Sequence, residues 1–283
     1  MLDVLARNEY GFSINFKNNS KFDIVDITGL NPVNATINSS SIPNYSGSIF
    51  NSSYVGNRNI VLYIVCHSYD NKARKELNNV FIPSKQIRLE LGNYYIDGYV
   101  ESTEYNHFNN KIVIQTSILC LYPYFSLKNE TTIKISSITN LLEFPASFPA
   151  YGIPFAETSE NTMENIVYNG EIGTGCIIKA YFYSEIYKFK VNNITHNQTI
   201  DILHWFEDGD ELTIDTRFAK KNITLKNSEG HITNLIPYLR DYLETQWIEL
   251  ETGENNIFFT TSDDYTLDNV DIYLTYNEKI GGM

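Results

Sequence analysis

Cysteine, basic residues and long apolar runs are all scarce in this sequence of 283 residues. The three cysteines, Cys66, Cys120 and Cys176, lie far apart, with no CxxC pair and no histidine at zinc spacing, which argues against a disulfide framework and a zinc cluster. No stretch approaches the ~18 apolar residues of a membrane-spanning helix, and no apolar segment follows a basic start. We therefore expect a protein that folds inside the cell, without a signal peptide or a membrane segment.

The deficit of positive charge is confined to one half of the chain. Lys and Arg number 21 against 34 Asp and Glu, for a net charge of −13, which argues against a partner held by its phosphates, such as nucleic acid. Residues 1–140 hold 12 basic and 11 acidic residues, whereas residues 141–283 hold 9 and 23. The ordinary interpretation of this asymmetry is a solvated acidic face on the second half.

What the sequence does contain is the composition of a mainly β protein. A hydrophobic content of 42% can fill one large core or two ordinary ones, and β-branched and aromatic residues recur in short runs between Asn, Gly, Asp and Ser. One helix is predicted over 70–81, where Ala73, Leu77 and Phe81 share a face, Asp70 can act as the N-cap and Pro83 lies beyond the end.

Alternating or continuous apolar runs predict the strands. A buried strand is expected at 59–65, an alternating one at 94–101 and another at 111–121. A second set includes 187–191, where Tyr187, Phe189 and Val191 alternate with lysines, and the runs at 212–214 and 270–276. Short strands at this spacing favour an antiparallel sandwich.

Three prolines within ten residues mark the expected domain boundary. Pro145, Pro149 and Pro154 suit neither a helix nor a central strand, so we predict an N-terminal domain at 1–140, a linker at 141–160 and a sandwich at 161–283. The polar segment 31–53 resembles a loop and is expected to be a long excursion between strands. Long ordered excursions usually contact something.

No catalytic motif is present, and we predict no catalytic, cofactor-binding or metal-binding residue. The sequence has no GxSxG elbow, phosphate-binding loop or HExxH helix. The acidic cluster of Glu207, Asp208, Asp210 and Glu211 could supply calcium ligands or a carboxylate pair that acts on a sugar. An exposed turn that leads into a strand is the favoured interpretation.

The remaining candidates for chemistry also have ordinary structural explanations. His204 beside Trp205 could stack on a carbohydrate ring, although a half-buried strand residue next to a core aromatic is the commoner case. His67 and His107 are isolated, and a lone histidine is usually neither a ligand nor a base.

The segments resemble, in order, those of the distal tail protein family of long-tailed bacteriophages and its relatives in prophages and phage-tail-like particles. In the first half the matching segments are GLNP at 29–32, RNI at 58–60, the helix at 70–81, FIPSK at 81–85, YYIDGYVE at 94–101 and CLYPYF at 120–125. In the second half they are NIVYNGE at 165–171, GDELTID at 209–215 and GENNI at 253–257. The resemblance makes 209–215 a hairpin.

The resemblance implies a structural virion protein without enzymatic activity or cofactor, made in the host cytoplasm and located at the phage tail tip. In that family the N-terminal domains form a hexameric ring, and galectin-like C-terminal sandwiches lie outside it. The implied partners are the tail tube protein, the tape-measure protein and a tail tip or receptor-binding protein. A nearly neutral first half suits subunits packed side by side, while acidic sandwiches would face solvent or a basic partner.

Two other classes of function stay open at this point. One is a carbohydrate-binding protein that recognises host cell-wall glycan through aromatic stacking. The other is a glycosidase that uses carboxylates such as Asp208 and Glu211.

Overall fold

A computed structural model of the protein describes residues 2–17, 19–44, 46–67, 71–106, 112–136, 138–140, 156–158, 163–261 and 269–283. Two compact units are formed, one by Met1–Asn129 with Lys279–Met283 and the other by Glu130–Glu278. The division precedes the Pro-rich segment because β11 (Thr131–Ser136) pairs along its whole length with β24 (Val270–Tyr276) of the second unit. Most of 141–160 lies outside the described residues, so its role as a linker stays a prediction.

The mainly β class is confirmed, because antiparallel sheets build both units and α1 (Asn71–Val80) falls within the helix predicted at 70–81. The expected N-cap, Asp70, lies outside the described residues. Strands of the first unit are β1 (Val4–Asn8), β2 (Ser13–Asn15), β3 (Phe22–Thr28), β4 (Ala35–Ser41), β5 (Ser48–Val55), β6 (Arg58–Cys66), β7 (Gln86–Leu91), β8 (Tyr94–Asn106), β9 (Ile112–Cys120), β10 (Phe125–Leu127) and β25 (Lys279–Ile280).

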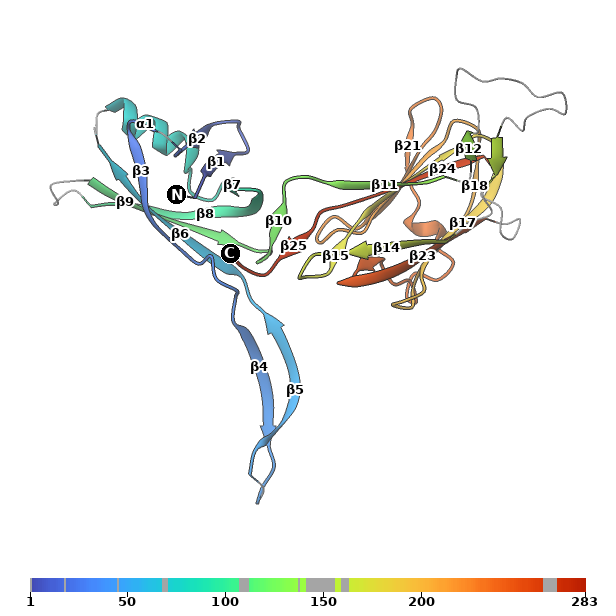
Figure 1. Ribbon diagram of the computed structural model, residues 1–283, viewed down its shortest axis with the longest axis horizontal. Coiled ribbons are helices and arrows are strands. Elements are labelled where there is room, and N and C mark those ends of the chain that lie inside the picture. Colours follow the sequence, from blue (N-terminus) through green and yellow to red (C-terminus); the bar gives the residue numbers. More distant parts are fainter. Residues whose placement is uncertain are drawn as a thin grey trace, which may run out of the picture. The chain divides into compact units, whose positions relative to one another are not determined.

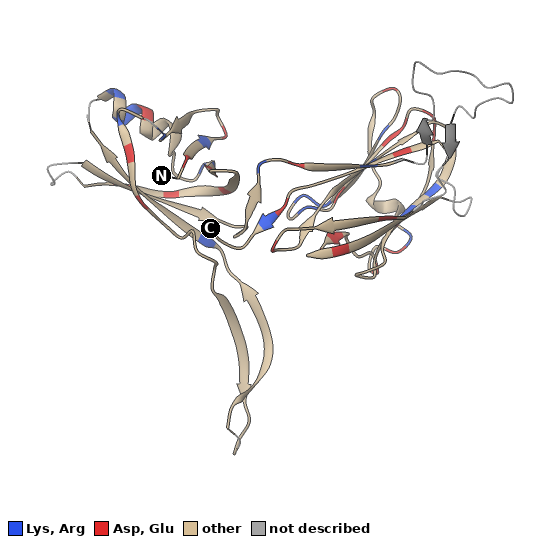
Figure 2. Ribbon diagram, viewed as in Figure 1, with Lys and Arg blue, Asp and Glu red and all other residues tan. Residues whose placement is uncertain are grey.

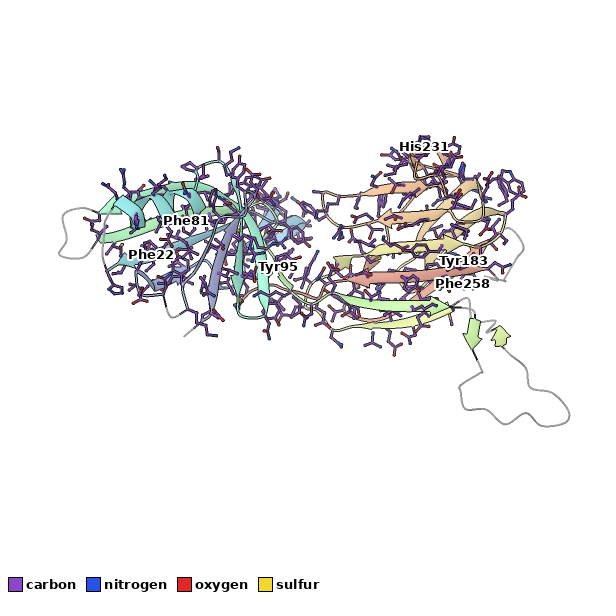
Figure 3. All side chains as sticks on the ribbon, turned by 90° about the horizontal axis from the view of Figure 1, so that it is seen from above. Phe22, Phe81, Tyr95, Tyr183, His231 and Phe258 are labelled. Atoms are coloured by element: carbon purple, nitrogen blue, oxygen red, sulfur yellow. The ribbon has the colours of Figure 1, made fainter. Side chains whose placement is uncertain are left out.

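One sheet organises the first unit. Its order is β2-β1-β7-β8-β9-β6-β3, and β10 pairs with both β8 and β25. Alternate side chains of these strands point to one core, which α1 joins through Ala73, Leu77 and Val80. Figure 3 places Phe22 and Phe81 beside the helix, where both are fully buried. The strands predicted at 59–65, 94–101 and 111–121 are therefore the central strands of this sheet.

The polar segment 31–53 is a β-hairpin and not a loop, which corrects the expectation from the sequence. Strands β4 and β5 pair from Ala35 with Val55 to Ser41 with Ser48, with one irregularity after Asn38. Figure 1 shows this hairpin, hereafter the arm, leaving the sheet between β3 and β6. Every residue of both strands is exposed, so no inward and outward faces exist and no alternation appears in the sequence.

The second unit is the predicted antiparallel sandwich. Its remaining elements are β12 (Ile138–Asn140), β13 (Ala156–Thr158), β14 (Met163–Tyr168), β15 (Thr174–Gly175), β16 (Ile177–Phe182), β17 (Ile186–Asn193), β18 (Gln198–Phe206), β19 (Glu211–Asp215), β20 (Asn222–Lys226), β21 (Ile232–Asn234), the 3-10 helix η1 (Ile236–Tyr238), β22 (Glu249–Leu250) and β23 (Gly253–Thr261). A six-stranded sheet, β11-β24-β16-β19-β20-β21, and a four-stranded sheet, β14-β23-β17-β18, share one core.

Aromatic packing joins these two sheets. Phe182 of β16 stacks on Phe206 of β18, with ring centroids 4.2 Å apart, and Phe189 of β17 meets both rings edge to face. The register between β17 and β18 shifts between Tyr187 and Phe189, where Lys188 has a positive φ. The regular alternation predicted for 187–191 therefore stops at this bulge, and Tyr187 instead contacts Trp205 on the outer side.

Candidate assembly surfaces

The arm is an uncharged, exposed surface that its own unit does not cover. No Lys, Arg, Asp or Glu occurs between Asp26 and Arg58, and Figure 2 shows the arm without either charge colour. Polar pairs link its strands, including Asn38 with Ser52 and Asn51 with Ser40. Its exposed large apolar side chains are Ile37, Ile42, Ile49, Phe50, Tyr54 and Val55. Such a surface is suited to contact with another protein.

A buried arginine fixes the base of the arm. Arg58, at the start of β6, is 2% exposed, and it donates hydrogen bonds to the carbonyl oxygens of Gly29, Asn31, Pro123 and Gly281 over 2.5–2.8 Å. Its guanidinium also lies 4.6 Å from the centre of the Phe125 ring. Burial lowers the pKa of this guanidinium. The single side chain thus ties the strand end before the arm to β10 and the chain's C-terminal segment.

Two glycines of the family-like segments are required by close packing. Gly29 has φ +86°, and a Cβ there would lie 2.0 Å from the carbonyl oxygen of Asn59. A Cβ on Gly98 would lie 2.7 Å from the Ile118 side chain and 2.9 Å from the sulfur of Cys120. Through these glycines, the segments at 29–32 and 94–101 pack closely against those at 58–60 and 118–120.

A second apolar feature lies at the edge of the same sheet. Strand β3 ends the sheet order, and its register irregularity exposes Val25 to 67%. A groove of about 260 Å³ there is lined by Leu2, Val4, Ile24, Val25, Asp26, Ile27 and Leu30. An exposed strand edge with apolar side chains is a template for pairing with another chain.

The acidic cluster of the second unit forms the turn between β18 and β19. Asp210 is buried, and its carboxylate accepts a hydrogen bond from the backbone N–H of Glu207. Glu211 pairs with Lys179 at 2.7 Å, and this hydrogen bond holds the pKa of Glu211 below its usual value. The structure therefore places Asp210 and Glu211 in structural contacts, and Asp208 beside Gly209, whose φ of +87° shapes the turn.

His67 and His204, two of the histidines considered from the sequence, belong to different units. His67 lies 2.6 Å from the Asp23 carboxylate in the first unit, and His107 lies outside the described residues. His204 points toward Phe206 and Tyr238, and burial lowers its pKa. Trp205, in contrast, is 58% exposed, so the two neighbours that the sequence suggested as a stacking pair lie on opposite sides of β18.

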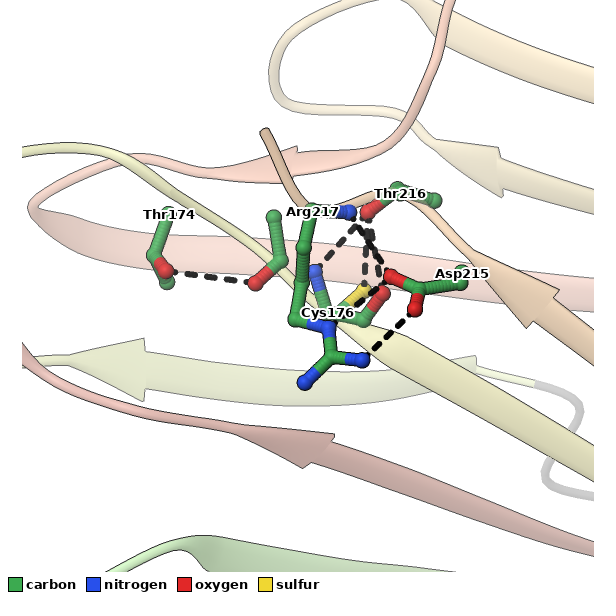
Figure 4. A network of polar contacts seen from close by, with 6 residues as sticks. Thr174, Cys176, Asp215, Thr216 and Arg217 are labelled. Carbon is green, nitrogen blue, oxygen red and sulfur yellow. Dashed lines mark hydrogen bonds and ion pairs between the residues drawn. The ribbon is translucent and has the colours of Figure 1, made fainter. Parts of the chain in front are cut away.

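All three cysteines are buried. Figure 4 shows the Cys176 backbone N–H and C=O bonded to Thr216, beside an ion pair of Asp215 with Arg217. Burial raises the pKa of the Cys176 thiol to about 12, and that of the Cys120 thiol to the same value. A neutral thiol is a poor nucleophile, so the contacts in Figure 4 serve packing between β16 and the segment after β19.

The described ranges also lack two general signatures. No three His, Cys, Asp or Glu side chains in them lie close enough to hold a metal ion. Within the same ranges, no helix has the length and apolarity needed to cross a bilayer.

Comparison with known proteins points to phage tails. Residues 169–279 match the family model of the siphovirus-type tail component, C-terminal domain. The fold matches the crystal structure of Dit (gp 19.1) of phage SPP1, described as a paradigm of the hub adsorption apparatus in phages that infect Gram-positive bacteria. That match has a TM-score of 0.68 and 10% identity, and covers 98% of each chain.

Chains of the phage P2 baseplate in its activated conformation also match. The TM-score is 0.51 at 10% identity for both the calcium and the strontium structure, with 97% and 98% of this chain and 98% of those chains covered. A comparison with curated proteins found no match. The family model confirms the resemblance inferred from the sequence over residues 169–279, and the structural matches show that the fold is shared over nearly the whole chain.

Proposed function

We propose that the protein forms a hexameric ring at the tip of a phage tail. Its second domain matches the family model of the siphovirus-type tail component, and its fold is shared with a phage distal tail protein. In this proposal the ring joins the tail tube and the tape-measure protein to the tail tip or receptor-binding proteins. The protein acts in the virion as a structural subunit and catalyses no reaction.

The observation that carries the proposal is the arm. An isolated two-stranded hairpin is marginally stable in water, and this one exposes six large apolar side chains without a charge to keep it solvated. A neighbouring subunit would cover those side chains. The arm and the groove at β3 are different surfaces of one unit, which is the arrangement that a head-to-tail ring contact requires.

Electrostatics supports the same division of roles. Residues 1–140 carry 12 basic and 11 acidic residues, so identical copies of this part do not repel one another strongly. The second domain, with its excess of acidic residues, would disfavour close packing of identical copies. We therefore assign ring contacts to the first unit and contacts with other tail proteins to the second.

The assembly state of the purified full-length protein tests this proposal. Mass photometry and negative-stain electron microscopy over rising concentrations are expected to show six-membered rings. Phe50→Ser should weaken each contact by about 1–2 kcal/mol, since it removes a large apolar side chain from the interface. Val167→Ser, at another exposed position on β14 of the second unit, is the control. A protein that stays monomeric at high concentration and is absent from particles of its source would contradict the proposal.

A further inference from the structure

An aromatic pair, the exposed Trp205 and the half-buried Tyr187, marks one end of the outer face of β17 and β18. The rings of Tyr187 and Trp205 lie 4.9 Å apart at a tilt of 43°, on paired positions of the two strands. Trp205, near the end of the edge strand β18, is 58% exposed. Tyr187 packs against the indole and restrains it, which leaves a wide, rigid apolar surface open to solvent.

A polar pocket lies on the same face, further along both strands. In the register of β17 and β18, Lys190 pairs with Asp201 and Tyr187 pairs with Trp205. Asp201 and Trp205 both lie on the side away from the core, because the residue that follows each of them, Ile202 and Phe206, is fully buried in it. The pocket is lined by Lys190, Asn197, Thr199, Asp201, Arg240, Asp241, Leu243, Glu244, Thr245 and Gln246. Its volume is about 540 Å³.

The wall of this pocket, residues 240–246, is held in place before any ligand arrives. At its two ends the backbone N–H groups of Arg240 and Gln246 donate to the carbonyl oxygens of Asp201 and Thr199. Inside the segment, the Asp241 carboxylate accepts hydrogen bonds from the next backbone N–H groups, at 2.9 and 3.2 Å. A preformed wall lowers the entropic cost of binding.

The charges around the pocket balance one another. Three of the nine basic residues of 141–283 meet here, namely Lys188, Lys190 and Arg240, and they face Asp201, Asp241 and Glu244. Asp201 is almost fully buried and bound by Arg240 at 3.1 Å. Lys190, Glu244 and Gln246 make no side-chain hydrogen bond or ion pair within the described ranges. Free donors and free acceptors therefore line a site without excess charge, in an acidic domain.

We propose that this face, the Trp205 surface together with the Lys190 pocket, binds a neutral oligosaccharide. The apolar face of a sugar ring covers Trp205, and hydroxyl groups, which both donate and accept, pair with Lys190, Glu244 and Gln246. The local charge balance disfavours a polyanionic glycan and a basic peptide alike. Trp205 and Asp201 are four residues apart, about 13 Å along a strand, so a ligand that touches both ends has several sugar units.

Fluorescence titration of the full-length protein tests the proposal, because the chain contains two tryptophans, Trp205 and Trp247. Trp247→Phe leaves Trp205 as the sole indole. The probes are linear neutral oligosaccharides of the glucose, galactose, rhamnose and N-acetylglucosamine series, first ranked on a glycan array. We expect at least one series to change the Trp205 fluorescence in a saturable way.

Substitutions then locate the binding site. Trp205→Ala and Lys190→Ala should each weaken array binding about tenfold or more, consistent with the loss of one aromatic stack or one set of hydrogen bonds. Tyr183→Ala and Lys220→Ala, at other exposed sites of the second unit, should leave it unchanged. The proposal is overturned if no neutral oligosaccharide binds, if only charged glycans bind, or if binding survives both Trp205→Ala and Lys190→Ala.

Discussion

Two hairpins of this protein have similar strand lengths and opposite sources of stability. Strands β17 and β18 hold Phe189, Val191 and Ile202 in the sandwich core. Strands β4 and β5 of the arm bury nothing and are joined by neutral polar pairs. We infer that β hairpins serve two purposes in this chain: one completes a core, and the other presents side chains to a partner.

The largest expected effect separates the two hairpins directly. Phe189→Ala removes a fully buried ring from the sandwich core and should lower the free energy of unfolding by about 3–5 kcal/mol. Phe50→Ala deletes the same group from the arm, where it is 63% exposed, and should change the stability of the dilute monomer by less than about 0.5 kcal/mol. Urea unfolding of both variants below the assembly concentration checks this. Equal losses would mean that the arm packs on its own subunit.

The second-largest expected loss of stability concerns the junction between the arm and the sheet. Arg58→Met leaves four carbonyl oxygens without their donor in a buried place and should destabilise the first unit by about 2–4 kcal/mol. Arg88→Met is the control, because Arg88 forms an exposed pair with Asp97 and should cost no more than about 1 kcal/mol. Thermal unfolding measures both changes. An Arg58 variant as stable as the Arg88 variant would show that the arm's base does not depend on this side chain.

The same comparison explains what the sequence could predict. A continuous apolar run located β6, and hydrophobic periodicity located β9 and α1, because all three elements pack against a core. Periodicity did not predict the strands of the arm, because a periodic pattern arises where one face of an element is buried, and Ile37 and Phe50 are exposed. The family-like segments were informative for a different reason: Gly29 and Arg58 meet at the base of the arm, where few other residues fit.

On the outer face of β17 and β18, even less of the structure could be predicted from the sequence. The sequence suggests Trp205 as a stacking residue because it is an aromatic beside His204. In the structure His204 faces inward, and the ring that packs against Trp205 is that of Tyr187. A bulge in the register of β17 and β18 places Tyr187 there, and the lysine-rich sequence does not indicate this bulge. The pocket depends on segment 240–246, which is bound to β18 through backbone atoms. Backbone hydrogen bonds between distant segments leave no residue pattern, so no reading of side-chain types could have joined Lys190 to Glu244.

The smallest expected effect concerns charge. Glu211 is partly exposed and paired with Lys179, and the hydrogen bond from Lys179 depresses its pKa. A depressed carboxylate pKa contributes stability above the unfolded-state value, here 4.5, and that contribution is lost as the pH falls through the lower folded-state value. Glu211→Gln should therefore cost about 0.2–1 kcal/mol at pH 7 and nothing below both pKa values. Asn51→Ala removes a neutral pair of the arm, so its effect should be the same at pH 7 and pH 3. Unfolding free energies measured between pH 3 and pH 7 test this difference. A pH-dependent effect of Asn51→Ala together with a pH-independent effect of Glu211→Gln would contradict it.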